Sequence, residues 1–454
     1  MSAPHAVEVH DGLANPQRLL AFTTLAMAIS MAALDGTIVT VALPTMGRQF
    51  AVAPESVIWI VNAFQLAVTV SLLPLAALGD MFGYRRVYWW ALALFTAASL
   101  ACALAPTFAV LTFARLVQGL GAAGIMSVNI ALIRFIYPHV RLGQGVGNMA
   151  VVVAVATAGS PSVAAAILSV ASWHWLFLIN VPIGALALVM AARTLPATPR
   201  AAGSLDLWSV LLNALTFGLL IAGVNGIGQG GNPSLALFEI AVGAAIGVAL
   251  VRRQLKLSAP LLPVDLLRRP VFALSLATSI ASFGAQSLAI VSLPFYFEDR
   301  LGHSATTTGL LLTPWPVATA LIAPIAGRLA DRFIPGILGS IGLLVMGGGL
   351  ALVALGIGDS HPASLAWRLA ICGLGFGFFQ SPNNRVIIGS APRERSGGAA
   401  GLQSSGRLIG QSLGTALVAA AYGRAPAHAT EIALWGAAAL TLAGAVSSGL
   451  RKAD

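Results

Sequence analysis

The sequence predicts an all-α polytopic membrane protein with fourteen transmembrane helices. Of its 454 residues, 57% are hydrophobic and only 9% are charged, whereas about a quarter of the residues of a soluble domain carry charge. Fourteen apolar segments each approach the roughly 20 residues that a helix needs to cross a bilayer. The basic residues fall mainly in alternate loops between these segments. Together these observations predict a chain that crosses the membrane an even number of times.

The predicted spans follow one another along the whole chain. They begin near residues 19, 56, 86, 109, 144, 174, 207, 236, 270, 306, 336, 365, 400 and 432. The glycine-rich span after 207 and the small-residue span after 400 have the weakest apolar signal. The first span is too long for a signal-peptide core and lacks a small-x-small cleavage site, so we expect it to remain as a membrane anchor.

The positions of the arginines predict the orientation of the chain. Pairs such as Arg85 with Arg86, and Arg451 with Lys452, lie in loops on one side of the predicted topology, and few basic residues lie on the other. The positive-inside rule assigns the basic side to the cytoplasm. We therefore expect a multi-pass protein of the bacterial inner membrane with both termini in the cytoplasm. The net charge of +10 is explained by topology and does not indicate a nucleic-acid partner.

An internal repeat divides the chain. AALGDMFGYRRV after the second span is matched by GRLADRFIPGIL after the tenth, and TFARLVQGLGAAG in the fourth by AWRLAICGLGFG in the twelfth, each about 250 residues later. Parallel repeats around a midplane site are a common construction of secondary transporters. The predicted units are a cytoplasmic tail (1–18), a six-helix bundle (19–193), a linker with two additional helices (194–269) and a second six-helix bundle with a short tail (270–454).

Asp35 lies near the middle of the first apolar span. A charged aspartate at the centre of a membrane helix costs roughly 2.5–3.5 kcal/mol on insertion scales. Such residues usually face a bundle interior and mark an ion or substrate pathway. Asp35 is therefore the first functional candidate, and the alternative is a purely structural role in pairing with a neighbouring helix.

Several motifs together resemble the major facilitator superfamily, and within it the fourteen-helix drug:proton antiporter family. They include LDGTIVTVALP in the first span, LGDMFGYRR after the second, RLVQGLGAAG in the fourth, WHWLFLINVPIG at the sixth and GLQSSGRLIGQSLGTAL near the thirteenth. The resemblance covers essentially the whole chain and implies two six-helix bundles plus two extra helices. It also implies proton-coupled export of lipophilic cations or neutral amphiphilic drugs by alternating access, with protonation of Asp35 as the coupling step.

The resemblance gives Asp35 a partner. Arg115 matches the arginine that the family places near its proton site, and Gln118 lies nearly one helical turn away on a similar face. A nearby cation favours ionised Asp35 and a dry pocket favours its neutral form, so a switch between these environments would take up and release a proton. A permanent structural ion pair is the alternative.

Two further family motifs are present with departures. A conformational latch on the cytoplasmic side is expected from Asp80, Gly83, Arg85, Arg86, Gly327, Arg328, Asp331 and Arg332. Its first copy is incomplete, because Ala76 replaces a glycine and Met81 replaces a basic residue. The antiporter motif of the fifth span keeps Gly159 and Pro161, but alanines replace its paired glycines, which weakens the inference of exchange.

The expected substrate path lies between the two halves. Family geometry indicates a set of mostly uncharged side chains: Asn62, Phe64, Gln65, Met126, Asn129, Phe283, Gln286, Trp315, Phe376, Phe379, Gln380, Asn383 and Asn384. Aromatic and methionine side chains suit bulky apolar ligands and cations, with ordinary helix packing as the alternative for each. Because Asp35 is the one obvious anionic point, the sequence favours lipophilic monovalent cations or neutral amphiphiles.

Other functions stay open at the level of sequence. The main alternative is a dedicated exporter of a metabolite, such as a sugar, an amino acid or a siderophore, followed by a sensor or channel without proton coupling. No zinc-binding, phosphate-binding or nucleophile-base pattern is evident, so we predict no enzyme, no cofactor and no metal site. The expected partners are protons, a small amphiphilic or cationic molecule and membrane lipid, and a monomer is expected.

Overall fold

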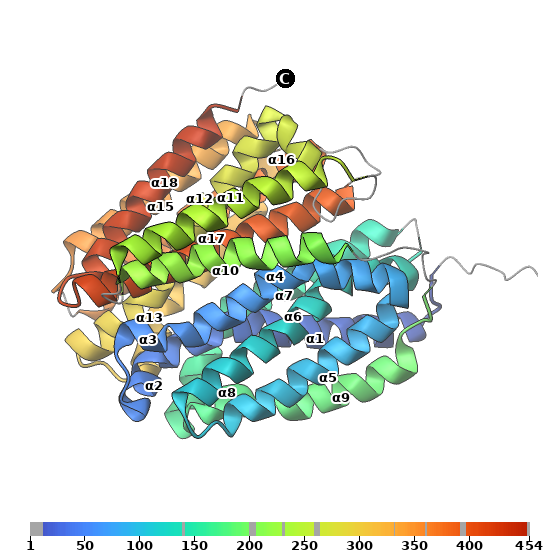
Figure 1. Cartoon of the computed structure of the whole chain (residues 1–454), viewed down its shortest axis with the longest axis horizontal. Coiled ribbons are helices and arrows are strands. Elements are labelled where there is room, and N and C mark those ends of the chain that lie inside the picture. The colour runs from blue at the N-terminus through green and yellow to red at the C-terminus, as the bar shows by residue number, and fades with distance from the viewer. Residues whose placement is uncertain are drawn as a thin grey trace, which may run out of the picture.

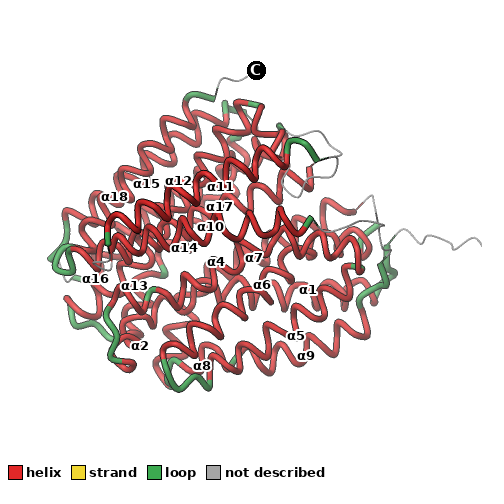
Figure 2. The backbone as a smooth tube through the Cα atoms, in the orientation of Figure 1, coloured by secondary structure: helices red, strands yellow, loops and turns green. Residues whose placement is uncertain are grey.

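The computed structural model describes residues 12–138, 141–198, 206–228, 232–257, 264–330, 332–358, 361–390 and 396–451. In these residues the chain is almost wholly helical and contains no strand (Figure 2). Thirteen helical stretches in this part are long and apolar enough to cross a membrane. A fourteenth helix, α17 (Ser396–Arg424), has 29 residues and is also long enough, but it is more polar and falls outside that set.

The helices start close to the predicted positions. The largest difference is four residues, at α17, which begins at Ser396 while its span is predicted to begin near residue 400. The prediction of an all-α polytopic membrane protein is therefore confirmed. The apolar pattern was sufficient because a helix that crosses lipid must satisfy every backbone group within itself.

The first six spans form one bundle, drawn from blue to green in Figure 1. Its first span is a continuous run of two α-helices joined by a short 3₁₀ segment. The elements are α1 (Gln17–Ile38), η1 (Val39–Ala42), α2 (Leu43–Phe50), α3 (Pro54–Val57), α4 (Trp59–Phe82), α5 (Tyr84–Ala103), α6 (Phe108–Ile136), α7 (Leu142–Val170), α8 (His174–Leu178) and α9 (Asn180–Thr194).

The last six spans form the second bundle, drawn from yellow to red in Figure 1. Many of its helices begin with proline, whose fixed φ suits the first helical turn and whose missing N–H would be unpaired there. The elements are η3 (Val264–Arg268), α12 (Pro270–Phe295), η4 (Tyr296–Arg300), α13 (Ala305–Leu312), α14 (Pro314–Leu329), α15 (Pro335–Leu355), α16 (Pro362–Gly389), α17 and α18 (Ala429–Gly449).

Two additional helices, α10 (Leu207–Gly228) and α11 (Pro233–Gln254), connect the bundles and pack against each other. One specific contact docks α10 on the first bundle. Pro74 lies inside α4 and has no N–H to give to the carbonyl of Val70 one turn earlier. The side chain of Asn213 on α10 donates to that carbonyl at 2.9 Å, so the linker satisfies a backbone group that proline leaves free.

The linker helices are also joined by an ion pair. Arg253 donates two hydrogen bonds of 2.9 Å to the carboxylate of Asp206, which precedes α10. These bonds favour the charged carboxylate and lower the pKa of Asp206 to about 2. The pair therefore remains charged throughout the neutral pH range.

The internal repeat is visible in the packing of equivalent helices. Gly121 on α6 lies so close to α5 that a Cβ atom there would be 2.6 Å from the backbone nitrogen of Phe95. Gly375, its counterpart in the repeated motif, lies equally close to α15, where a Cβ would be 2.6 Å from the carbonyl oxygen of Gly342. Small residues allow such close helix approach in membranes. Each bundle uses the repeated glycine for the same contact.

Candidate functional site

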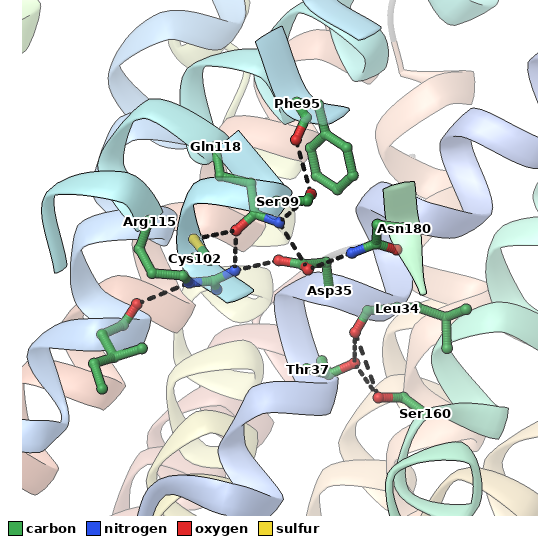
Figure 3. A network of polar contacts seen from close by, with 11 residues as sticks. Leu34, Asp35, Thr37, Phe95, Ser99, Cys102, Arg115, Gln118, Ser160 and Asn180 are labelled. Carbon is green, nitrogen blue, oxygen red and sulfur yellow. Dashed lines mark hydrogen bonds and ion pairs between the residues drawn. The ribbon is translucent and has the colours of Figure 1, made fainter. Parts of the chain in front are cut away.

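Asp35 lies at the centre of a buried polar network in the first bundle (Figure 3). Its side chain comes from α1 and is 1% exposed, and Arg115 from α6 is 0% exposed. One carboxylate oxygen of Asp35 accepts a hydrogen bond from Arg115. The other accepts from Gln118 and from Asn180, each at 2.9 Å. A single carboxylate thus joins three helices, α1, α6 and α9.

Arg115 and Gln118 are held in position by further bonds. Arg115 Nε donates to the carbonyl of Ile60 on α4 at 3.1 Å, and its Nη1 donates to Gln118 Oε1 at 2.7 Å. Gln118 Nε2 also donates to the hydroxyl of Ser99 on α5 at 2.9 Å. The three-residue spacing of Arg115 and Gln118 places both on one helix face. The predicted sharing of one network by Asp35, Arg115 and Gln118 is what the structure shows.

The guanidinium of Arg115 is also covered by aromatic rings. Its central carbon lies 4.2 Å from the ring centroid of Phe64 and 5.6 Å from that of Phe177. These are favourable cation–π distances. Its second terminal nitrogen, Nη2, is buried and has no hydrogen-bond partner among the described residues. The cation is therefore stabilised by one carboxylate, by the oxygens of Ile60 and Gln118 and by two rings, and the described residues leave its Nη2 without an acceptor.

This arrangement suits a carboxylate in its charged form. Asp35 accepts three hydrogen bonds, from Arg115, Gln118 and Asn180, and a carboxyl group that only accepts needs no proton of its own. A proton added to Asp35 would remove the charge opposite Arg115 and convert one acceptor into a donor. The network cannot accommodate that change without moving, because every neighbour of the carboxylate is a donor.

The predicted substrate residues of the first bundle lie in different environments. Phe64 covers Arg115, and Gln65 accepts a hydrogen bond of 3.1 Å from Thr415 of the second bundle. Asn62 and Asn129 are almost fully buried, and neither amide has a partner among the described residues. Met126 is half-buried. An unpaired buried amide costs about 1–3 kcal/mol, so both asparagines are unusual for purely structural positions.

In the second bundle three of the predicted aromatic residues lie close together. The rings of Phe283 and Phe376 meet edge to face at 5.2 Å, and Phe379 is 6.4 Å from Phe376. Trp315 is 1% exposed, and its indole nitrogen has no partner among the described residues. Gln286 is half-buried.

The predicted amides of α16 separate into two groups. Asn383 donates to Ser279 at 2.8 Å and accepts from Arg451 at 2.7 Å, in a cluster near the end of the chain. Asn384, by contrast, accepts from Gln403 on α17, and Gln380 is half-buried. Asn383 is thus occupied by neighbours within its own bundle.

The antiporter motif lies where α7 crosses the second bundle. Ser162 next to Pro161 is 3.0 Å from the hydroxyl of Thr313. Gly309 on α13 faces the same segment, and a Cβ there would be 2.7 Å from the carbonyl oxygen of Pro161 and 2.9 Å from Ala165. A Cβ on Gly159 would meet nothing within 4 Å. The close approach that paired glycines would give is supplied here by a glycine on the opposite helix.

The two bundles are clamped together at the end that carries α2, α3 and α13 (Figure 1). Arg48 on α2 pairs with Glu298 at 2.5 Å and with Asp299 at 2.7 Å, both from η4 of the second bundle. Thr45 adds a hydrogen bond of 3.1 Å to Glu298. The side chain of Glu298 is 1% exposed, so this clamp buries an acid whose partner comes from the other bundle.

The predicted latch lies at the opposite end of the molecule from this clamp. Asp80 is exposed and accepts a hydrogen bond from Tyr84. Arg85 donates to the carbonyl of Ala192 at 2.5 Å, and Gly83 turns the chain with a φ of +93°. All of these contacts stay within the first bundle.

The remaining latch residues make no contact that would join the bundles in the described part of the chain. Arg86, Arg328 and Arg332 are exposed, and Gly327 is half-buried. Asp331 lies outside the described residues. The latch therefore stays a prediction for a conformation other than this one.

Asn180, which binds Asp35 directly, is a site residue that was not predicted from the sequence. Its only signal is a polar residue within the apolar run WHWLFLINVPIG. Cys102 is buried close to this network, with its sulfur 3.5 Å from Gln118 Oε1. Among the described residues, no group of three or more His, Cys, Asp or Glu side chains is placed to hold a metal ion.

Comparisons with known proteins agree with this picture. A sequence profile described as the Major Facilitator Superfamily matches residues 25–415. The uncharacterized transporter YebQ of Escherichia coli K12 is 52% identical over 443 residues, which is 97% of each chain. The multidrug resistance protein Stp of Mycobacterium tuberculosis is 31% identical over 414 residues, covering 89% of this chain and 76% of Stp.

Solved structures show the same fold. A bacterial homolog of the human lysosomal transporter Spinster, in an inward-facing and occupied conformation, has a TM-score of 0.70 over 96% of this chain and 97% of its own. The sequence identity is 15%, so this similarity supports the architecture alone.

Proposed function

The chain belongs to the Major Facilitator Superfamily and is a transporter rather than an enzyme, and we propose that it exports small amphiphilic molecules in exchange for protons, with Asp35 as the proton site. The observation that carries this proposal is the buried network of Asp35, Arg115, Gln118 and Asn180. A carboxylate that is this deeply buried and fully bonded is costly to build. Ionisable residues at such positions in membrane helices usually serve a function, and a proton site is such a function.

Protonation of Asp35 would act on helix packing through Arg115. Removing one partner of a buried ion pair costs about 3–5 kcal/mol, because the other charge is left uncompensated. A shift of about 5.5 kcal/mol converts a two-state equilibrium from 1:99 to 99:1. Neutralising Asp35 therefore supplies much of the free energy needed to change the arrangement of α1, α6 and α9.

Alternating access needs a second closing contact at the other end of the molecule. The clamp of Arg48 with Glu298 and Asp299 joins the bundles at one end. We propose that it opens when the latch containing Asp80 closes the opposite end. With the basic loops in the cytoplasm of a bacterial inner membrane, the conformation described here would open toward the cytoplasm.

Drugs are the leading substrate class, because a relative with 31% identity is named a multidrug resistance protein. The predicted preference for lipophilic cations is less well supported by the geometry, since Asp35 is paired and 1% exposed in this conformation. A susceptibility panel in an efflux-deficient host separates a multidrug transporter from a dedicated metabolite exporter. A multidrug transporter raises tolerance to several unrelated compounds, and a dedicated exporter does not.

Transport in proteoliposomes tests the coupling. With an imposed pH gradient, we expect Asp35→Asn to lose gradient-driven transport of a compound identified by the panel, at unchanged protein abundance. Asp206→Asn removes an acid outside the network and serves as the matched control. Full gradient-driven transport by Asp35→Asn would refute the assignment.

A further inference from the structure

Helix α17 carries a polar stripe that the proposed mechanism does not use. Gln403, Arg407 and Gln411 are spaced by four residues, which places them on one helix face. All three are half-buried, whereas the neighbours Gly406 and Leu408 are buried. The polar character that sets α17 apart from the thirteen apolar spans therefore includes one continuous face.

The contacts of α17 show the direction of this stripe. Thr415, four residues beyond Gln411 on the same face, donates to Gln65 of α4 at 3.1 Å, and on one flank the hydroxyl of Ser412 is 3.5 Å from that of Thr69 on α4. On the other flank α17 packs closely on α12, where a Cβ on Gly410 would collide with the carbonyl of Ile280 and lie 3.1 Å from the backbone nitrogen of Gly284. Gln403 donates to Asn384 on α16. The stripe thus faces the region between α4 of one bundle and α16 of the other.

Arg407 has no partner in this region. It makes no hydrogen bond or ion pair with any described residue. The sequence also offers it no carboxylate, because α12, α16 and α17 contain no Asp or Glu. The one acid of α4 is Asp80, at the exposed end of that helix and bonded to Tyr84.

An unpaired guanidinium within a membrane helix is expensive. Buried charges are normally paired, as Arg115 is with Asp35. Asp35 and Arg115 neutralise each other, and Arg407 adds a positive charge that no carboxylate of α12, α16 or α17 offsets. Its planar fork of donors suits the two oxygens of a carboxylate.

We propose that Arg407 is a substrate-binding residue that recognises an anionic group, such as a carboxylate or phenolate, on an amphiphilic molecule. The apolar body of such a molecule has aromatic partners nearby in the fold, since Phe283 and Phe376 lie on α12 and α16. The inference rests on the proposed transport function and names its substrate class. It differs from the sequence-based expectation of a cationic substrate, which considered Asp35 without Arg407.

Cysteine labelling tests the accessibility and charge of the stripe without any transport assay. Cys102 and Cys372 are both buried, so a new cysteine at Gln411→Cys can be labelled against a low background. The probes are the anionic sulfonatoethyl and the cationic trimethylammonioethyl methanethiosulfonates. We expect Arg407→Gln to lower the anionic-to-cationic rate ratio about tenfold, because a charge one helical turn away is removed.

The matched control is Arg252→Gln in the same Gln411→Cys background, since Arg252 is exposed on α11 and carries the same charge. That control should leave the ratio unchanged. An unchanged ratio in Arg407→Gln would overturn the proposal. So would the absence of labelling by either reagent, which would place the stripe against protein or lipid.

Binding of two dyes with one ring system tests the substrate class. Fluorescein is an anion at pH 7.4 and rhodamine 123 is a cation, and fluorescence anisotropy reports the binding of each to the purified protein. We expect fluorescein to bind more tightly than rhodamine 123, and Arg407→Gln to weaken fluorescein about tenfold or more, as for a charge-assisted hydrogen bond. Arg407→Lys should recover part of the loss.

Three results would contradict the anionic class: no fluorescein binding, tighter binding of rhodamine 123, or equal fluorescein binding by Arg407→Gln. None of these measurements involves Asp35. If Asp35→Asn transports normally while the labelling and dye results hold, only the proton-coupling proposal fails. If Asp35→Asn loses gradient-driven transport while the labelling or dye results fail, the proton-coupling proposal is supported and the anionic substrate class is refuted.

Discussion

The first bundle buries Arg115 against a carboxylate, whereas the second bundle buries Arg451 among neutral side chains. Arg451 is 5% exposed and donates to Ser275 at 3.0 Å, to Asn383 at 2.7 Å and to Ser448 at 2.5 Å. Hydroxyl and amide oxygens can hold a guanidinium, but they do not change charge when a proton arrives. In the proposed mechanism Arg115 is therefore part of a switch, whereas Arg451 is part of a fixed support.

The internal repeat makes the comparison sharper. Gly121 and Gly375 keep the same close contact in the two bundles. In that alignment Leu369 stands where the first bundle has Arg115, and Cys372 stands where it has Gln118. Both are fully buried. The bundles thus share this close helix packing, while the second has Leu369 and Cys372 at the positions of the two polar residues that the proposed proton site uses in the first.

The largest effect is expected when the first bundle is made to resemble the second. Arg115→Leu leaves Asp35 buried without its cation, which should destabilise the fold by about 3–5 kcal/mol and abolish coupled transport. Arg115→Lys keeps the charge but loses the planar fork, so transport should fall about tenfold. Thermal unfolding of the purified protein and transport in proteoliposomes check both values. Transport by Arg115→Leu at the wild-type rate would show that Arg115 is not needed for coupled transport.

A smaller effect is expected from Asn180, the donor to Asp35 that the sequence did not reveal. Asn180→Leu removes one of three donors to Asp35, and a hydrogen bond to a charged group is worth about 1.5–3 kcal/mol. Transport should fall about tenfold. Its pH profile should move to higher pH, because loss of the hydrogen bond destabilises the charged carboxylate of Asp35 more than the protonated carboxyl. Gln49→Leu, at an amide bonded to Trp173 instead, is the control. A profile that does not move would show that Asn180 only packs.

The matching change in the second bundle should be milder. Arg451→Leu removes a buried cation that has no carboxylate partner, while it leaves Asn383 and Ser448 short of one donor. These effects oppose each other, so we expect a change in unfolding free energy within about 2 kcal/mol and retained pH-gradient coupling. Loss of coupling at normal abundance would mean that the second bundle also takes part in proton transfer.

The smallest effect concerns the linker. Asp206 has a pKa of about 2 in the folded protein because Arg253 is bonded to it. Its folded pKa lies below the unfolded value, so its stabilisation is fully present at neutral pH and is lost only as pH falls through the acid range toward 2. Arg253→Gln should therefore lower thermal stability by the same small amount at pH 6 and pH 8. A clear difference between these two pH values would contradict the assignment.

The sequence was sufficient to find Asp35, because a carboxylate is rare in an apolar run of this length and is costly to place in lipid. Helical spacing was sufficient to find Gln118. Asn180 was not found, because an amide in an apolar run is common and its partner depends on how α9 packs beside α1. Arg407 was visible within a family motif, but only the structure shows that no residue in its described part pairs with it. The residues of the latch were predicted, but whether the latch is open or closed was not, because the same sequence adopts both conformations.

Direct detection of proton release tests the central claim most closely. When an exported compound is added to the purified protein in weakly buffered solution, a pH-sensitive dye should report protons released by the wild type and by Asp206→Asn. Asp35→Asn should bind the compound and release none, because its amide cannot carry the proton. Equal proton release by Asp35→Asn and the wild type would show that the proton resides elsewhere.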